Sequence, residues 1–165
     1  MAVDLPTGAK PNIGEAFAHI NSLKSPTVDD LKVMVLLEAA GQELYYQMSG
    51  GTEHPDLLAI LAQHGREEMG HAYRVAKAIK AISGEDYAPP AAADNPYLSG
   101  PIPTAPMTAE ALRGLAQGEF AGEVLYEVWA SNSESAEAAR LFRQNGGEER
   151  DHGNRLLEAA ALLEG

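Results

Sequence analysis

The chain has 165 residues, 45% of them hydrophobic, and a formal net charge of −12. This length fits one domain with a single core, and the acidity makes nucleic acids and anionic membranes poor partners. Because there is no cysteine, disulfides, thiolate metal sites and iron–sulfur clusters are excluded. The N-terminal residues do not resemble a secretory signal and no apolar run approaches membrane-spanning length, so a cytoplasmic protein is expected.

In chain order, the sequence predicts an N-terminal arm followed by four long helices. Residues 1–26 are interrupted by proline and glycine and form the arm, with room for one short helix at about 13–23. Thr27 and Thr108 are suitable N-cap residues for the first and third long helices. Residues 27–165 are expected to form one all-α bundle, with helices at about 28–49, 55–83, 108–130 and 134–163.

The connector between the second and third long helices is rich in proline. Six prolines lie between Tyr87 and Met107, so this segment cannot be helical in its middle. Extended at about 3 Å per residue, it can span a bundle, and such a crossover lets the two helices that it joins run parallel. The alternative, a linker between two separate hairpins, is disfavoured because a lone two-helix hairpin cannot bury its apolar stripe. Residues 131–134 break the chain and start the last helix with capping-box residues.

An internal repeat relates the two helical hairpins. Of the 37 positions from Glu38 to Arg74, 12 are identical to the residue 81 positions later. Several matches are polar or ionisable, whereas shared helical periodicity would match mainly leucine and alanine. Small residues also gather at the level of the matched glutamates, including Gly41 and Gly65 and their repeat mates. Since each mid-helix glycine costs roughly 1 kcal/mol relative to alanine, they indicate either room for something or very close helix packing.

Each copy of the repeat contains a Glu-x-x-His motif, and a further glutamate lies 30 positions before the glutamate of the motif. Residues three apart on a helix lie on one side, so both side chains of a motif can reach one metal ion. Counting 1.5 Å per residue from the expected helix ends places the two glutamates of a hairpin at nearly the same height. The sequence therefore predicts six metal ligands in one layer: Glu38, Glu68, His71, Glu119, Glu149 and His152.

The charge of this layer also favours metal binding. Four ionised glutamates inside a bundle are prohibitively costly unless they are compensated or protonated. Two divalent ions would balance four carboxylates, and two neutral imidazoles would complete the ligand set. Ordinary surface or core polar positions are the alternative. Mixed carboxylate and imidazole ligands suit iron or manganese, and zinc can occupy such a site as a substitute.

The pattern resembles the ferritin-like di-iron carboxylate superfamily, in which two helices each supply a glutamate and two others each supply Glu-x-x-His. Across residues 28–160 it is most similar to the rubrerythrin group, which shares Gly118-Glu119 and the tyrosine seven residues after Glu38 and Glu119. The resemblance implies a ferritin-like four-helix bundle. It also implies that Glu38 and Glu119 are terminal ligands, that Glu68 and Glu149 bridge the metals, and that His71 and His152 each cap one metal.

Other residues are expected to support the site. Tyr45 and Tyr126 share a helix face with their glutamates and are predicted either to donate hydrogen bonds to ligand carboxylates or to fill the core. Glu123 lies one residue beyond the place of an extra carboxylate in rubrerythrins, and is an extra ligand or a supporting or solvent-facing residue. His64, two turns before the first motif histidine, is expected to be ordinary. Ion pairs within a helix or contacts to the ligands are expected of Glu67, Arg74, Glu148 and Arg155.

Together these features predict a non-haem di-iron oxidoreductase that reduces peroxide or dioxygen. Because the chain has no cysteine and thus no rubredoxin domain, electrons are expected from an external donor protein. The resemblance also implies a homodimer. The alternatives are an iron-binding or storage protein without turnover and a manganese catalase-like centre.

Overall fold

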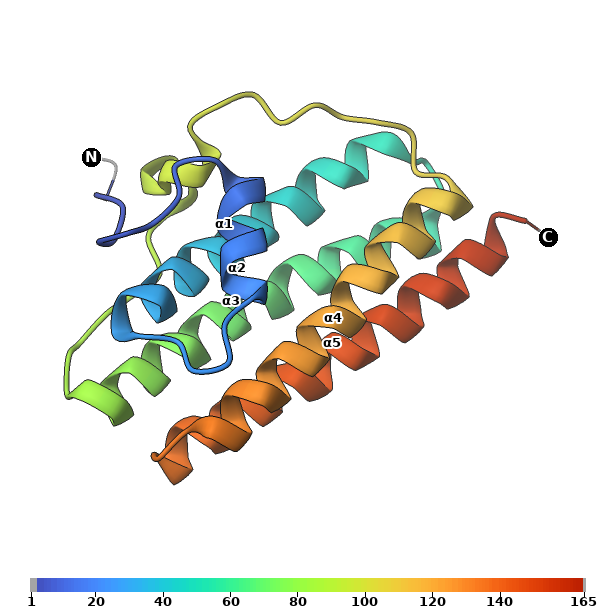
Figure 1. The fold of residues 1–165 in the computed structure, drawn as a ribbon. Coiled ribbons are helices and arrows are strands. Elements are labelled where there is room, and N and C mark those ends of the chain that lie inside the picture. The colour runs from blue at the N-terminus through green and yellow to red at the C-terminus, as the bar shows by residue number, and fades with distance from the viewer. Residues whose placement is uncertain (1–2, 165) are drawn as a thin grey trace.

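The computed structural model describes residues 3–164, which form five α-helices and three short 3₁₀ turns and contain no β-strand (Figure 1). The long helices agree with the sequence-based prediction to within two residues at each end. None of the helices in residues 3–164 is long and apolar enough to cross a membrane. The helices are α1 (Ile13–Asn21), α2 (Val28–Met48), α3 (Pro55–Ser83), α4 (Ala109–Asn132) and α5 (Ala136–Leu162), and the 3₁₀ turns are Ser49–Gly51, Ala92–Asp94 and Pro96–Leu98.

The helix ends follow from local hydrogen bonding. Thr27 caps α2 in a capping box, because its hydroxyl accepts from the Asp30 N–H at 3.2 Å and the Asp30 carboxylate accepts from the Thr27 N–H at 2.9 Å. Thr108 caps α4 in the predicted way. Gly84 ends α3 with φ +79°, a left-handed conformation that favours glycine. The start of α5 differs from the expectation, since Ser135 is its N-cap and the helix begins two residues later than predicted.

The four long helices pack as two hairpins joined along α3 and α5. Helix α2 packs on α3, α4 packs on α5, and α3 contacts α5. The connector returns along the molecule, so α3 and α4 run in the same direction (Figure 1). Buried Asn95 attaches the connector to α2 by donating to the Leu36 carbonyl at 2.8 Å. The Met107 N–H donates to the Gly51 carbonyl at 2.9 Å, and this approach requires glycine, because a Cβ there would lie 2.0 Å from the Ala105 carbonyl oxygen.

Two apolar clusters fill the interior, one towards each end of the bundle. The first includes residues of α1 as well as Val35, Val75 and Phe142 from the long helices. Because Ala16 and Ile20 of α1 are fully buried in it, part of the expected N-terminal arm belongs to the core. The second cluster lies nearer the α2–α3 turn and includes Leu57, Leu61, Leu112 and Leu156.

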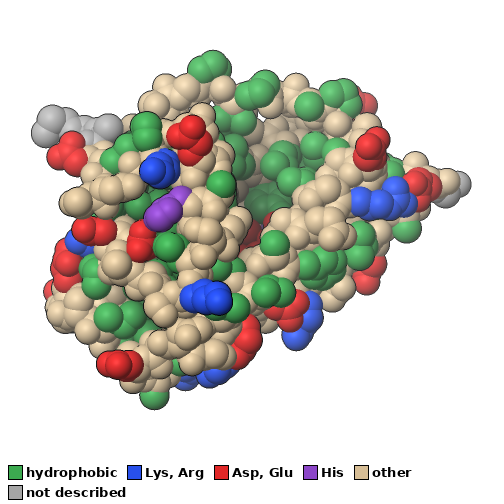
Figure 2. All heavy atoms as spheres, in the orientation of Figure 1, with side chains coloured by type: hydrophobic (Ala, Val, Ile, Leu, Met, Phe, Trp, Pro, Cys, Tyr) green, Lys and Arg blue, Asp and Glu red, His purple; other side chains and the backbone are tan. Residues whose placement is uncertain are grey.

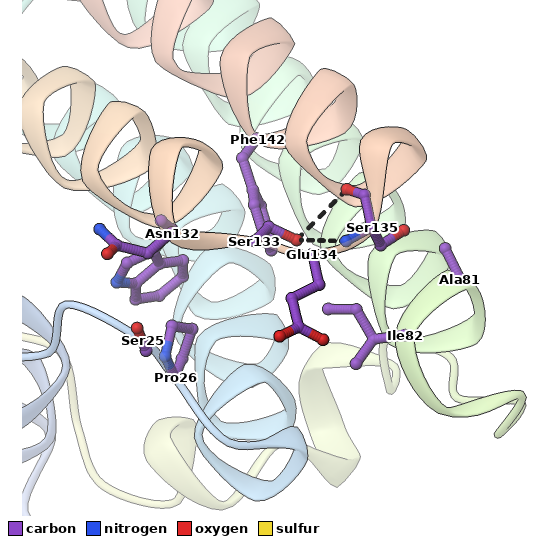
Figure 3. A pocket seen from close by; sticks show the side chains of 10 residues that line it. Ser25, Pro26, Ala81, Ile82, Asn132, Ser133, Glu134, Ser135 and Phe142 are labelled. Atoms are coloured by element: carbon purple, nitrogen blue, oxygen red, sulfur yellow. Dashed lines mark hydrogen bonds between the residues drawn. The ribbon is translucent and has the colours of Figure 1, made fainter.

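Two of the hollows on the surface of residues 3–164 lie beside the long helices. A cavity of about 660 Å³ lies between α2 and α4, and Figure 2 shows it as a depression with mostly hydrophobic walls. A second pocket of about 500 Å³ lies where the α4–α5 turn meets the segment before α2, with Trp129 and Phe142 among its lining residues (Figure 3). Of the described residues that line this second pocket, Glu134 alone is ionisable, so it offers little for catalysis or metal binding.

Candidate metal centre

The six predicted ligands meet in one buried layer. On α3, α4 and α5 the ligands lie between residues of the two apolar clusters, whereas Glu38 on α2 lies beside Ala39, near the end of the first cluster. His71 and His152 are fully buried, and the side chains of the four glutamates are 6–12% exposed. Six ionisable side chains in a dry interior require either a cation or protons to compensate them.

One half of the layer surrounds the Nδ1 atom of His71. This nitrogen lies 3.2 Å from Glu149 Oε1, 3.6 Å from Glu38 Oε2 and 3.8 Å from Glu68 Oε2. Ligand atoms of these four residues lie within 4.8 Å of one another. The other half repeats this arrangement around the Nδ1 atom of His152, with distances of 3.2 Å to Glu68 Oε1, 3.5 Å to Glu119 Oε2 and 3.8 Å to Glu149 Oε2.

Glu68 and Glu149 belong to both halves. Each presents one carboxylate oxygen to His71 and the other oxygen to His152. Glu38 faces only the first half, and Glu119 faces the second. Two carboxylates are therefore shared between the halves, and two belong to one half each. Oxygen and nitrogen ligands at about 2.1 Å from a metal ion lie roughly 3–3.5 Å apart, which is close to the separations found here.

The histidines are oriented by carboxylates outside the layer. Nε2 of His71 lies 3.2 Å from Glu148, and Nε2 of His152 lies 2.8 Å from Glu67. The pKa of Glu148 is lowered, chiefly by its hydrogen bond with His71, so this ionised carboxylate accepts the proton of Nε2. Nδ1 of each ring is then the nitrogen that faces the carboxylates of the layer. Neither Nδ1 has a hydrogen-bond partner within residues 3–164, as expected of an atom that awaits a metal.

Each supporting carboxylate is held by an arginine of the other hairpin. Arg155 donates to Glu67 at 2.8 Å, and Arg74 donates to Glu148. Burial opposes ionisation of Glu67, but hydrogen bonds from Gln63 and Arg155 outweigh it and lower the pKa of Glu67 to about 2. Glu67 and Glu148 contact the ligand histidines, which is one of the two arrangements expected for them. The other expectation was an ion pair within one helix, but their ion pairs with Arg155 and Arg74 connect different helices.

The two tyrosines make the predicted hydrogen bonds to carboxylates. Tyr45 donates to Glu119, and Tyr126 donates to Glu38. Each tyrosine therefore supports the terminal glutamate of the other hairpin. Burial and the nearby carboxylate raise the pKa of both phenols well above the usual value of 10.0, so both remain protonated donors.

The glycines near the layer have two different roles, and both were expected: some leave room for a carboxylate, and others allow two helices to pack closely. A Cβ at Gly41 would lie 3.0 Å from a Glu68 carboxylate oxygen, and one at Gly122 would lie 3.3 Å from the Glu149 carboxyl carbon. These two glycines make room for the shared carboxylates. A Cβ at Gly65 would lie 2.5 Å from the Tyr46 ring, so this glycine permits close packing of α2 on α3.

Without bound cations, some carboxyl groups of the layer keep their protons. Burial and the charge of Glu149 raise the pKa of Glu68 well above its usual value. Burial and a hydrogen bond with Glu119 raise the pKa of Glu149 in the same way. Burial also opposes ionisation of Glu119, but hydrogen bonds with Glu149 and His152 outweigh it and lower the pKa of Glu119 to about 2. Protons therefore remain on the two shared carboxyls.

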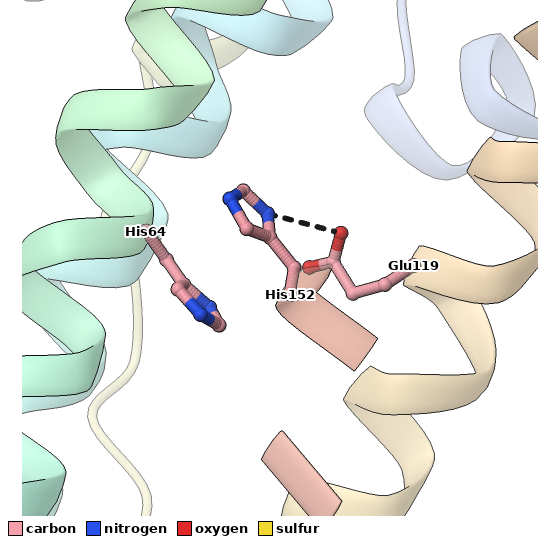
Figure 4. A group of neighbouring side chains, drawn as sticks. All are labelled: His64, Glu119 and His152. Atoms are coloured by element: carbon pink, nitrogen blue, oxygen red, sulfur yellow. Dashed lines mark ion pairs between the residues drawn. The ribbon is translucent and has the colours of Figure 1, made fainter. Parts of the chain in front are cut away.

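His64 differs from its sequence-based expectation. It is fully buried, and neither ring nitrogen has a hydrogen-bond partner in the described chain. Its ring stacks on His152 with centroids 4.1 Å apart, and it lies near Glu119 (Figure 4). An imidazole binds metal in its own plane, so two stacked rings in this orientation cannot share one ion. Burial and the nearby His152 lower the pKa of His64 to about 3, which makes it a neutral packing partner of the ligand.

Of the two roles left open for Glu123, an extra ligand or a supporting or solvent-facing residue, the structure does not show the first, because Glu123 is not brought to the layer. Its carboxylate lies 3.6 Å from Arg150 Nη1, with the Glu123 side chain 35% exposed. It belongs to none of the groups of ligand atoms found in residues 3–164. The helical phase explains this difference, because Gly122 rather than Glu123 faces the carboxylate of Glu149.

Sequence reasoning missed Asn145, which occupies the repeat position of His64. Asn145 is fully buried, accepts a hydrogen bond from Arg74, and donates to the His71 carbonyl at 3.2 Å. It thus positions both the backbone of a ligand and the arginine that holds Glu148. The signal in the sequence was weak, since the repeat aligns two different polar residues at this position.

Comparison of this chain with protein-family models, with curated proteins and with solved structures gives no match.

Proposed function

We propose that this protein is a non-haem di-iron oxidoreductase built on a ferritin-like four-helix bundle. The observation that carries the proposal is the pair of ligand sets that share Glu68 and Glu149, each completed by an unpartnered histidine Nδ1. The donor set suits iron and also accepts manganese or zinc. Two bound ferrous ions would supply the two electrons that reduce one peroxide to water, and an external donor protein would return them.

The protein's own residues prepare the site for this chemistry. Glu67 and Glu148 fix the histidine tautomer by accepting the Nε2 proton, so that Nδ1 is free for a metal. Tyr45 and Tyr126 hold Glu119 and Glu38 by hydrogen bonds, and each keeps its phenol proton at the layer. The apolar clusters exclude water from the two sides of the layer that they cover, which strengthens the electrostatic interactions within it.

Anaerobic titration with ferrous iron tests the metal site directly. We expect two ions per chain for the wild type, and loss of both ions for Glu68→Ala or Glu149→Ala, because either change removes a ligand from both halves. Glu123→Ala is the control and should retain two ions, since Glu123 lies outside the layer. Unchanged binding in the Glu68 and Glu149 variants would refute the bridging assignment.

A peroxide pulse on the loaded protein then distinguishes the possible activities. Rapid oxidation followed by re-reduction with an added electron donor would support a peroxidase. Release of oxygen from peroxide without any reductant would instead indicate a catalase-like centre. A large, shell-sized particle in size-exclusion chromatography would favour iron storage.

A further inference from the structure

The groove between α2 and α4 reaches the carboxylate layer from outside. Its volume of about 660 Å³ is within the range of small-molecule pockets. Along α2 it extends from Met34 to Met48, which is about 20 Å at 1.5 Å per residue. Phe17 of α1 lies at one end and Met107 at the other. Four carboxylates lie at its floor, those of Glu38, Glu68, Glu119 and Glu149.

The walls of this groove are apolar and carry no cation. None of the described residues that line it is lysine, arginine or histidine. Besides the four glutamates, the polar lining residues are Asn21 and Tyr45, and the Tyr45 hydroxyl already donates to Glu119. The α4 wall includes Gly114 and Gly118, and a Cβ at either position would meet no atom within 4 Å. The groove therefore has free space beside this part of α4.

We propose that the groove binds a neutral molecule with a hydrocarbon chain and holds it against the carboxylate layer. The apolar walls favour a hydrocarbon. An anion would meet an acidic floor and no cation in the lining, and even with two divalent ions bound against four carboxylates no positive charge would be left over to pair with it. The inference adds to the proposed function an organic molecule that lies beside the metal centre. Binding of this molecule to the apolar walls does not itself require metal.

A slender molecule fits this groove better than a helix from a second protein. A helix with its side chains is about 10–12 Å across, so it could cover the mouth of the groove but not descend between α2 and α4 to the floor. A second copy of this chain that covers the groove is nevertheless a defined outcome of the test.

The neutral fluorophore N-phenyl-naphthylamine provides the assay, used with the full chain in metal-free and zinc-loaded forms. We expect saturable fluorescence enhancement with one site per chain in both forms. Decanol should displace the fluorophore, and decanoate, which has the same chain length but a negative charge, should be at least about tenfold weaker. Absence of saturable binding, or equal competition by decanol and decanoate, would overturn the proposal.

Gly118→Leu tests the location of the site. A leucine there can project into the groove without a clash, because a Cβ at Gly118 meets no atom within 4 Å. We expect it to weaken fluorophore binding by about tenfold or more. Gly147→Leu is the matched control: Gly147 is also a mid-helix glycine with no atom near its Cβ position, but it lies on α5 outside the groove and should bind like the wild type.

The remaining outcomes separate this proposal from the others. Equal binding by Gly118→Leu and the wild type would refute the assigned groove. A concentration-dependent dimer that excludes the fluorophore, measured by sedimentation velocity, would assign the groove to a second copy and also refute the proposal. Ferrous binding is measured separately on the same samples. If metal binding fails while the fluorophore still binds at the groove, the proposed function falls and the groove assignment stands.

Discussion

Without bound metal, the folded protein should lose stability as the pH rises above the range in which glutamates of an unfolded chain ionise. Burial, together with carboxylate neighbours, raises the pKa of Glu68 and Glu149 well above the usual value of 4.5. The folded chain therefore holds protons that the unfolded chain releases. His71 acts in the same direction, because the charge of Glu149 and other acceptors outweighs burial and raises its pKa well above 6.5.

The sign and the size of this effect follow from proton linkage. A group whose pKa is raised in the folded state contributes stability that is present below the unfolded pKa and is lost as the pH rises through the folded pKa. For each proton that the folded chain holds and the unfolded chain does not, the free energy of unfolding falls by about 1.4 kcal/mol for every unit by which the pH rises. Two carboxyls thus give a limiting slope of about 2.7 kcal/mol per pH unit. Glu38 and Glu119 have lowered pKa values, so their opposite contribution is confined to pH values below about 4.5.

Urea unfolding followed by circular dichroism measures this dependence. The wild type is unfolded in the presence of a chelator at several values from about pH 5 to about pH 8. The double variant Glu68→Gln/Glu149→Gln is the control, because its amides cannot ionise and should remove most of the slope. Loading the wild type with a divalent metal should also remove it, since the metal displaces the protons. Stability of the chelated wild type that is constant or rises with pH, or an equal slope in the double variant, would refute the reasoning.

Two further substitutions test how the surroundings support the ligands. Glu67→Ala removes the acceptor for the His152 Nε2 proton and should weaken metal binding about 10–100-fold in a titration, while urea unfolding shows a folded chain; unchanged affinity would contradict an orienting role. Gly41→Ala places a Cβ 3.0 Å from a Glu68 oxygen and should lower metal affinity by about tenfold, whereas Gly147→Ala, with no atom within 4 Å, should not. Equal affinity of the two alanine variants would show that the carboxylate of Glu68 can move freely.

The helices and the composition of the ligand layer could be predicted from the sequence because both depend on spacing along a helix. Thr27 and Thr108 mark helix starts by local chemistry, and the equal spacing of the glutamates in the two hairpins fixes their common height. The start of α5 was predicted two residues too early because Ser133 and Ser135 are both possible caps. Only packing decides between them, and Ser135 is the residue that caps the helix.

What could not be predicted is the pairing between the hairpins. Spacing shows that Tyr45 lies on the same face as Glu38, but its hydroxyl donates to Glu119 of α4. In the same way, Glu67 shares a helix with His71 but supports His152. These contacts depend on how far apart and at what angle α2, α3, α4 and α5 pack, and helix periodicity carries no information about that. The groove was missed for the same reason, because it is the space that α2 and α4 leave between them.

This exchange of contacts makes each hairpin dependent on the other. A hairpin alone would hold one terminal glutamate, one shared glutamate and one histidine of its half of the layer. The other hairpin supplies the tyrosine, the supporting carboxylate and the second shared carboxylate of that half. An isolated hairpin would therefore present a ligand set without the groups that orient it. The repeat in the sequence consequently does not indicate two independent metal sites. Two similar hairpins form one centre, and the pairwise exchange explains why the matched residues of the repeat include the polar supports as well as the ligands.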